Sequence, residues 1–185
     1  GSTNADLLAR SAAGEVIDGV VLVAEYQHAG RGRHGRSWSA PSGSQIAMSV
    51  GIGANDMPPD AWGWVPLLTG VAVVDAVREL CDIPAGLKWP NDVHVGSRKL
   101  AGILAEAGSS AGAVDHVVIG FGVNILRAAY PPDVAARATS IESELGRAVD
   151  RGLVLAECLA ALTNRYGMLR RDGANDVIAA WKARA

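Results

Sequence analysis

The chain has 185 residues, which suits one folded domain, and almost half of its residues are hydrophobic. The net charge of −2 excludes the overall basic character that a dedicated nucleic-acid-binding protein shows. Cys81 and Cys158 lie in apolar helical patterns without a Cys-x-x-Cys or Cys/His cluster, so we predict buried free thiols. The sequence shows neither a signal-peptide pattern nor the ~18 apolar residues of a membrane span. We expect a reducing, cytoplasmic setting and no membrane partner.

The first half of the chain predicts helix, strands and a long helix. Cap-type residues at 2–4 precede leucines at helical spacing, which predicts an N-terminal helix. Residues 20–27 (VVLVAEYQ) and 45–52 (QIAMSVGI) are predicted strands because of their β-branched and apolar content. The longest helical pattern covers residues 60–81, with Pro66 either near its true start or at a kink.

The second half predicts a run of strands and then helices. We expect a strand and a turn in 87–93, an antiparallel pair of strands in 98–108 and 115–125, and a loop at 130–134. Helices are predicted at 138–146, after a possible cap at Asp150 through residue 173, and at 175–185. This order indicates an α+β fold with a mixed β-sheet rather than regular βαβ alternation.

Residues 30–36 (GRGRHGR) combine three glycines with three arginines between two predicted strands. The glycines satisfy G-x-G-x-x-G, but a dinucleotide fingerprint must open a helix, and the following RSWSAPSGS is poor helix material. Asp56, about 20 residues further on, lies in a proline-rich loop rather than at a strand end. A single short insert also differs from disordered RNA-binding segments. Two interpretations remain, a solvated basic loop and a loop that grips phosphate or carboxylate through Arg31 and Arg33. Trp38 then offers a flat face to a purine or lies in the core.

Residues 88–106 (KWPNDVHVGSRKLAGILAE) form a second candidate segment. Pro90 favours an extended residue before it and places Asn91 and Asp92 on a turn after a strand. Asp92 can help hold a phosphate-bound Mg²⁺, which usually takes one or two protein carboxylates, or the pair simply forms an Asx-type turn. Lys99 either faces solvent or reaches an acyl phosphate as a compact cation.

A third candidate segment, GFGVN at 120–124, ends an apolar strand. Gly120 and Gly122 leave space for a group to pack closely on the sheet. Asn124 either hydrogen-bonds the edge of a base or belongs to a strand end that turns.

Five motifs follow one another over residues 2–124: STN, Q-x-x-GRGRxGRxW, KWPND, RKLAGIL-x-E and G-x-G-x-N. This ordered set resembles the catalytic domain of biotin–protein ligases; lipoate ligases and octanoyltransferases share the fold but lack these strings. The resemblance implies a mixed sheet flanked by helices, distantly similar to class II aminoacyl-tRNA synthetase cores. It also implies that biotin and MgATP form biotinyl-5′-AMP, whose biotinyl group passes to a lysine of a biotin carboxyl carrier domain.

The resemblance further implies roles for individual residues. Its implied biotin contacts are Ser2, Thr3, Asn4, Gln27, Arg31, Gly32, Arg33 and Lys99. Its implied contacts to ATP and the adenylate are Arg31, Arg33, Trp38, Asn91, Asp92, Lys99, Gly120, Gly122 and Asn124, with Asp92 also near the Mg²⁺ of MgATP. Its implied catalytic cations are Arg31, Arg33, Lys99 and Lys88.

The sequence departs from this family at several points. His34 stands where many members have Arg or another large residue, and QI at 45–46 replaces the usual NL. Members also carry residues upstream of STN and usually an SH3-like domain after the last helix; we expect residues 1–185 to form one catalytic domain without either. Two alternatives remain: a biotin- or nucleotide-binding fragment without turnover, and a lipoate or short-acid ligase. We expect no nucleic-acid partner, and either a monomer or a homodimer.

Overall fold

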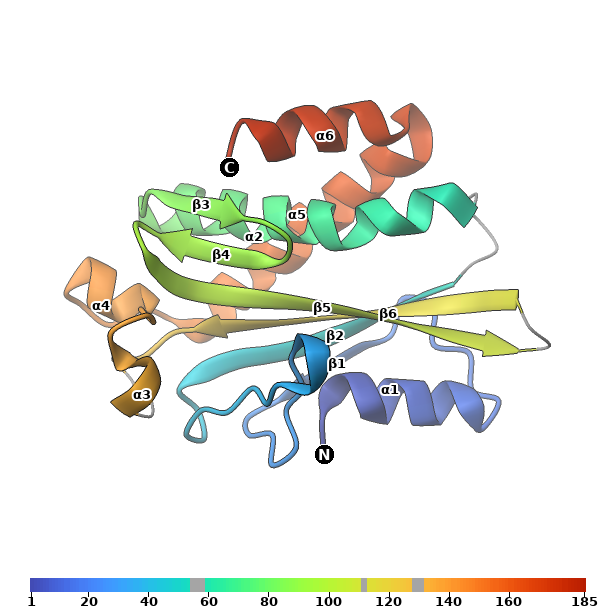
Figure 1. Ribbon diagram of the computed structural model, residues 1–185, viewed down its shortest axis with the longest axis horizontal. Coiled ribbons are helices and arrows are strands. Elements are labelled where there is room, and N and C mark those ends of the chain that lie inside the picture. The colour runs from blue at the N-terminus through green and yellow to red at the C-terminus, as the bar shows by residue number, and fades with distance from the viewer. Residues whose placement is uncertain (54–58, 111–112, 128–131) are drawn as a thin grey trace.

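The computed structural model describes residues 1–53, 59–110, 113–127 and 132–185, and Figure 1 shows its elements. Asp56 and residues 130 and 131 of the expected loop at 130–134 therefore lie outside the described residues. The rest of that loop expectation is wrong, because residues 132–134 belong to a short helix, Pro132–Ala135. The strands are β1 (Val21–Ala24), β2 (Gln45–Gly53), β3 (Ala85–Lys88), β4 (Asp92–Val95), β5 (Arg98–Ser110) and β6 (Ala113–Asn124). The α-helices are α1 (Thr3–Ala12), α2 (Val65–Cys81), α3 (Pro132–Ala135), α4 (Ile141–Leu145), α5 (Arg151–Asp172) and α6 (Ala174–Lys182). The 3₁₀ helices are η1 (Arg33–Gly35) and η3 (Pro59–Trp64).

The strands form one six-stranded sheet in the order β1-β2-β6-β5-β4-β3. Every strand pairing among the described residues is antiparallel, so the α+β class is confirmed but the expected mixed sheet is wrong. The parallel contact is an isolated bridge between Lys99 and Ala138, outside the strand ladders. The physical reason lies in the lengths of the connections: only two or three residues separate β3, β4, β5 and β6, and such short connections join antiparallel neighbours.

Two further predicted elements differ from those observed. The helix expected at 60–81 begins as the 3₁₀ helix η3 and becomes α-helical at Val65, with Pro66 in its first turn, where the missing amide hydrogen costs nothing. The segment expected as one strand and a turn at 87–93 contains two strands, β3 and β4, separated by the turn at Pro90 and Asn91. Four-residue strands carry too little alternation to be recognised from the sequence.

The sheet has one thickly covered face and one thinly covered face (Figure 1), with α2, α5 and α6 on one side and α1 on the other. Because alternate strand residues point to opposite faces, Ile119 and Phe121 of β6 join the main core beside α2, whereas Val118 packs with Leu7 and Ile17 near α1. The residues of β6 that share the α1 face with Val118 include Gly120 and Gly122. Their missing side chains leave room on that face for other groups.

The C-terminal helices are formed by local signals. Asp150 Oδ1 accepts hydrogen bonds from the backbone N–H groups of Gly152 (2.7 Å) and Leu153 (3.3 Å), which confirms the predicted cap of α5. Cys81 and Cys158 are both free and buried, as predicted. Burial raises the pKa of the Cys158 thiol to about 12, because the thiolate would lose its hydration.

Candidate active site

The floor of the site is a row of small residues on the α1 face of the sheet. Strand pairing places Gly102 of β5 opposite Gly122 of β6, and Gly122 opposite Ala47 of β2. The indole of Trp38 lies across this row: a Cβ atom at Gly122 would come within 2.6 Å of the indole, and one at Gly102 within 3.2 Å of the ring. The two glycines therefore permit an aromatic ring to lie flat against the sheet.

The edges of the Trp38 ring are held by polar groups. Its Nε1–H donates to Oε1 of Gln45, a buried residue at the start of β2. The ammonium group of Lys99 lies 5.3 Å from the ring centroid, within the range of a cation–π interaction. The ring is thus fixed between an amide on one strand and a cation on another.

The next row of the sheet carries the N-terminal end of α1. Gly120 pairs with both Leu104 and Ser49, and a Cβ atom on Gly120 would lie 2.1 Å from Oδ1 of Asn4. Asn4 Oδ1 accepts from Ser49 Oγ at 2.6 Å, while Asn4 Nδ2 donates to Glu106 Oε2 at 2.9 Å and to the carbonyl of Leu104 at 3.3 Å. Gly120 is therefore the position that lets α1 place a buried amide directly on the sheet.

A second pair of residues extends this polar end. Gln27 Oε1 accepts from the backbone N–H of Thr3 at 2.9 Å and from its hydroxyl at 3.1 Å. Ser49 Oγ also lies 2.7 Å from Thr3 Oγ1. Ser2, Thr3 and Gln27 are all buried, so this end of the site is uncharged, rich in hydrogen-bonding groups and shielded from water.

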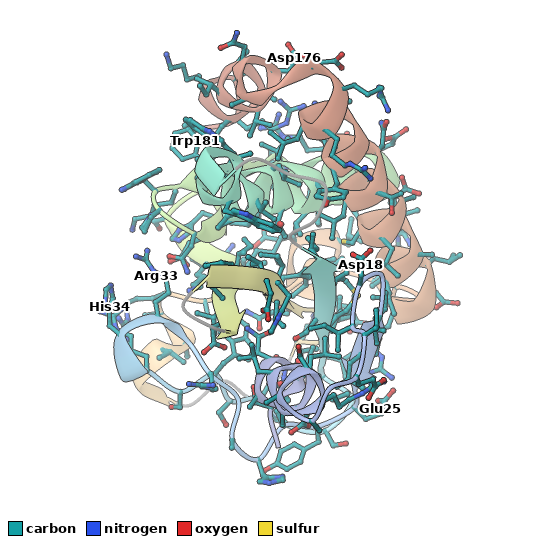
Figure 2. All side chains as sticks on the ribbon, turned by 90° about the vertical axis from the view of Figure 1, so that its right-hand side faces the viewer. Asp18, Glu25, Arg33, His34, Asp176 and Trp181 are labelled. Carbon is teal, nitrogen blue, oxygen red and sulfur yellow. The ribbon has the colours of Figure 1, made fainter. Side chains whose placement is uncertain are left out.

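The loop at 30–36 closes over the site as a backbone-bonded turn. Gly32 N–H donates to the carbonyl of Arg36 at 2.7 Å, and Trp38 N–H donates to that of Gly30 at 2.9 Å. His34 has a φ of 56°, a left-handed conformation that a non-glycine residue seldom adopts, and is exposed. Figure 2 shows Arg33 and His34 on this loop at the surface of the molecule. Among the residues that the structure describes, no α-helix follows the loop until α2, so the glycine pattern does not open a helix as a dinucleotide fingerprint must.

Two arginines tie the loop to opposite sides of the site. Arg31 Nη1 lies 3.1 Å from Glu106 Oε1 on β5. Arg33 Nη1 donates to Asn91 Oδ1 at 3.4 Å, in the turn before β4. The Asn91 side chain is itself anchored, because its Nδ2 donates to the carbonyl of Ile103 at 2.7 Å. The loop is consequently held at two points, one on each flank.

A charged cluster lies beside the aromatic floor. Lys99 Nζ is 2.6 Å from Asp92 Oδ1, and His94 Nε2 is 3.8 Å from Asp92 Oδ2. Burial, followed by the positive charge of Lys88, lowers the pKa of His94. The cation of Lys99 therefore has one carboxylate partner and a neighbouring imidazole that favours its neutral form.

These groups surround a cavity of about 440 Å³, which adjoins a second cavity of about 680 Å³ between the loop and the N-terminal end of α2. Arg31, Arg33 and Trp89 line both cavities. The first cavity thus combines an uncharged hydrogen-bonding end, an aromatic floor on the next row of the sheet, and the cations of Arg31, Arg33 and Lys99.

The sequence and the fold both match known proteins. Residues 2–124 match the biotin/lipoate A/B protein ligase family. The chain belongs to that family. It is 48 % identical over 189 aligned residues to the biotin–[acetyl-CoA-carboxylase] ligase of Mycobacterium tuberculosis, covering 100 % of this chain and 68 % of that protein. It is 33 % identical to the bifunctional ligase/repressor BirA of Escherichia coli, covering 98 % of this chain and 56 % of that protein. The biotin protein ligase of Aquifex aeolicus, solved with biotin and ATP, superposes with a TM-score of 0.87 at 27 % identity, covering 99 % of this chain and 74 % of that chain.

Membership of the biotin/lipoate ligase family confirms the resemblance drawn from the five motifs, together with the predicted α+β class and the class of enzyme, a ligase. The cavity brings together most of the residues that the resemblance assigned. All of the expected biotin contacts line it, as do Trp38, Asn91, Asp92, Gly120 and Gly122 of the expected nucleotide contacts.

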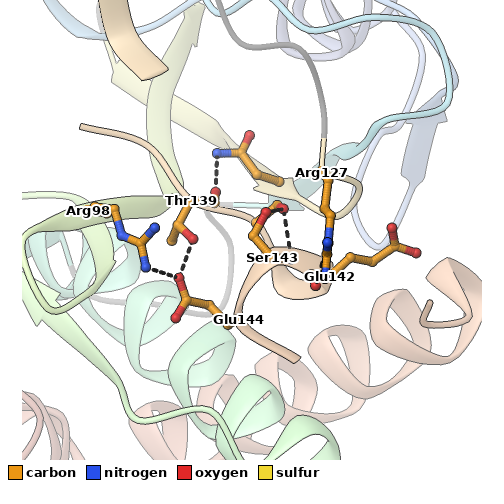
Figure 3. Close-up of polar contacts among 8 residues, drawn as sticks. Arg98, Arg127, Thr139, Glu142, Ser143 and Glu144 are labelled. Carbon is orange, nitrogen blue, oxygen red and sulfur yellow. Dashed lines mark hydrogen bonds and ion pairs between the residues drawn. The ribbon is translucent and has the colours of Figure 1, made fainter. Parts of the chain in front are cut away.

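Two assigned residues lie elsewhere in this ligase-family fold. Asn124 does not line either cavity; it is buried, and its Nδ2 donates to the carbonyl of Thr139 at 3.0 Å (Figure 3). Its amide therefore ties the end of β6 to the segment before α4. Lys88 is exposed on β3 and also lies outside both cavities. Gly120 lies beside Asn4, at the uncharged end rather than near Asn124.

Sequence reasoning missed three polar residues of this ligase-family site: Ser49, Glu106 and Gln45. Ser49 bonds Thr3 and Asn4 from a strand that looked merely apolar. Glu106 stood inside the RKLAGIL-x-E motif but received no role. Among the described residues, no group of three or more His, Cys, Asp or Glu side chains could hold a metal ion, and no helix is long and apolar enough to cross a membrane.

Proposed function

We propose that the chain is the catalytic domain of a biotin–protein ligase. It forms biotinyl-5′-AMP from biotin and MgATP and then transfers the biotinyl group to a lysine of a biotin carboxyl carrier domain. The observation that carries this proposal is that one cavity gathers an uncharged hydrogen-bonding end, the cationic side chains of Arg31, Arg33 and Lys99, and an aromatic floor. The parts of the adenylate need these three kinds of group: hydrogen bonds for the ureido ring, cations for the acyl phosphate and a flat surface for the adenine.

The uncharged end holds more hydrogen-bond acceptors than hydrogen atoms available to fill them. The Thr3 hydroxyl hydrogen is engaged by Gln27 Oε1, so the single hydroxyl hydrogen of Ser49 must serve both Thr3 Oγ1 and Asn4 Oδ1. A ligand with N–H donors would satisfy the acceptor that Ser49 leaves unpaired. The ureido ring of biotin offers two N–H groups and a carbonyl, whereas the dithiolane ring of lipoate offers neither. Because unpaired buried polar groups are costly, this end favours biotin over lipoate.

The cationic side chains of the cavity suit a reaction that joins two anions. A biotin carboxylate oxygen attacks the α-phosphorus of ATP, forming the acyl phosphate bond and releasing pyrophosphate. Arg31, Arg33 and Lys99 would offset the repulsion between the reactants and the charge that develops during attack. In the second step the carrier lysine amine attacks the anhydride carbonyl carbon, an amide forms, AMP leaves and the amine releases a proton. Neither step requires a covalent nucleophile from the protein.

Asp92 fits the magnesium of the MgATP substrate. It carries the one carboxylate among the described residues that line the first cavity, and Mg²⁺ on a nucleotide usually takes only one or two protein carboxylates. Phosphate oxygens and water would complete the coordination. The Lys99 ammonium beside Asp92 would then approach the same phosphates.

The test is biotin-dependent exchange of labelled pyrophosphate into ATP, followed by transfer to a purified carrier domain. Exchange with biotin but not with lipoate, and biotinylation of the carrier lysine, are the expected results. Tight biotin binding in calorimetry without any exchange would instead identify a binding fragment. Exchange supported equally by lipoate would overturn the assignment of biotin as the substrate.

A further inference from the structure

Glu106 occupies a junction that the proposed chemistry does not use. It lies on β5, on the α1 face of the sheet, and its side chain is 21 % exposed. One carboxylate oxygen faces Arg31 of the loop at 3.1 Å, and the other accepts the Asn4 amide of α1 at 2.9 Å. The loop and the uncharged end of the cavity therefore meet at a single side chain.

The hydrogen bond between Glu106 and Asn4 determines which way the side-chain amide of Asn4 faces. An ionised carboxylate only accepts hydrogen bonds, so it requires the NH₂ group of Asn4 to point toward it. The carbonyl of Leu104 makes the same demand from the side of the sheet. Asn4 Oδ1 is thereby turned toward Ser49 and the cavity. Without Glu106, the amide would lose the stronger of these two constraints, because hydrogen bonds to charged groups exceed those to neutral ones.

The bond to Arg31 determines where the loop rests. Arg31 is 49 % exposed and reaches Glu106 while lining the cavity, so the pair holds the loop over the cavity rather than away from it. The opposite flank is held by the longer contact between Arg33 and Asn91, at 3.4 Å. Glu106 is therefore the closer of the two anchors.

We propose that Glu106 is a positioning residue that couples the loop at 30–36 to the uncharged end of the cavity. It holds Arg31 with one carboxylate oxygen and orients the Asn4 amide with the other. The inference deepens the proposed function, since a pinned loop would retain the adenylate while a fixed amide would receive the ligand ring.

The experiment compares Glu106→Gln with the unchanged chain in three measurements. A glutamine has one acceptor oxygen, so it can serve Asn4 or Arg31 but not both. We expect trypsin to cut the loop at its arginines about fivefold faster, biotinyl-5′-AMP to dissociate about fivefold faster, and biotin affinity in calorimetry to fall about fivefold. A fourth measurement, the KM for ATP, is the control for a general loss of structure and should change less than twofold.

Arg31→Ala tests the roles of the two carboxylate oxygens of Glu106 separately, because it removes the partner of only one of them. In that background, Glu106→Gln should no longer change the trypsin rate, and its oxygen is then free to accept from Asn4, whereas Glu106→Ala, which removes that acceptor, should still weaken biotin binding. Glu25→Gln is the matched control, because Glu25 also pairs with an arginine from a distant segment, Arg151 at 2.9 Å, yet lies outside both cavities. It should change none of the three measurements.

Unchanged trypsin and biotin results in Glu106→Gln would overturn the proposal, as would full additivity with Arg31→Ala in the trypsin assay. These two measurements require no turnover. If the unchanged chain forms no adenylate, the proposed function fails while the role of Glu106 is still decided.

Discussion

Lys99 Nζ lies 2.6 Å from Asp92 Oδ1 and 5.3 Å from the centroid of the Trp38 ring. One cation thus touches both the carboxylate proposed to meet the magnesium and the ring proposed to lie near the adenine. Its side chain is 32 % exposed, so the ion pair is accessible from the cavity rather than sealed in the core. A phosphate entering the cavity can therefore share this ammonium group with Asp92.

The first prediction concerns this lysine. Lys99→Ala should slow biotin-dependent pyrophosphate exchange about 100-fold while changing biotin affinity less than about threefold, because its charge matters most as charge develops on the phosphate. Pre-steady-state adenylation and calorimetry measure the two quantities. Lys182→Ala, which removes an exposed lysine of α6, is the control and should change neither. Equal losses of rate and affinity would contradict the role given to Lys99.

The second prediction concerns the glycine floor. A Cβ atom in Gly122→Ala would lie 2.6 Å from the Trp38 indole, so the ring must leave the sheet. We expect the KM for ATP to rise about tenfold, because the aromatic surface proposed to lie near the adenine is displaced. Gly167→Ala in α5 is the control; its Cβ would meet only the flexible Arg171 side chain, and it should stabilise the helix by about 0.5–1 kcal/mol. An unchanged KM in Gly122→Ala would contradict a nucleotide site on this floor.

The third prediction concerns the C-terminal end of the chain. Trp181 of α6 packs edge-to-face against Trp89 with 5.8 Å between ring centroids, and the carbonyl of Arg184 accepts the Leu87 N–H at 2.6 Å. Trp181→Ala should lower the free energy of unfolding by about 1 kcal/mol and raise the KM for ATP, because the turn at Asn91 loses its support. Trp181→Phe should restore both. A loss of stability without any change in KM would show that the contact supports the fold alone.

The fourth prediction concerns pH. Burial raises the pKa of Cys158 to about 12 from an ordinary value of 9.0, so the folded state favours the protonated thiol. Its contribution to stability is complete below about pH 9 and is lost as the pH rises toward 12. Urea unfolding at pH 8 and pH 10.5 should therefore show a smaller loss of stability in Cys158→Ala than in the unchanged chain. Identical losses in the two proteins would contradict this linkage.

Thiol chemistry gives an independent check of the same burial. In the folded chain at pH 8, Cys158 should react with iodoacetamide far more slowly than in 8 M urea, since the thiolate is the reactive form. Peptide mapping after alkylation identifies which cysteine has reacted.

The sequence correctly predicted those features that depend on residues close together in the chain. The cap at Asp150, the proline in the first turn of α2 and the buried cysteines all depend on neighbours in the chain, and all are observed. The short strands β3 and β4 were not separated, because four residues give too few alternations. The antiparallel character of the sheet was missed for a related reason: the strand order follows from which hairpins close, not from composition.

The sequence by itself determined the family, through five motifs in a fixed order, and with it the residues expected around the site. Only the tertiary structure decided what each does with its polar atoms. It placed Trp38 on Gly122, Gly120 beneath Asn4, and Asn124 away from the cavity in a bond to Thr139. The reason is that cross-strand register brings together residues far apart in the chain, and neither motif spacing nor composition records which atoms then meet.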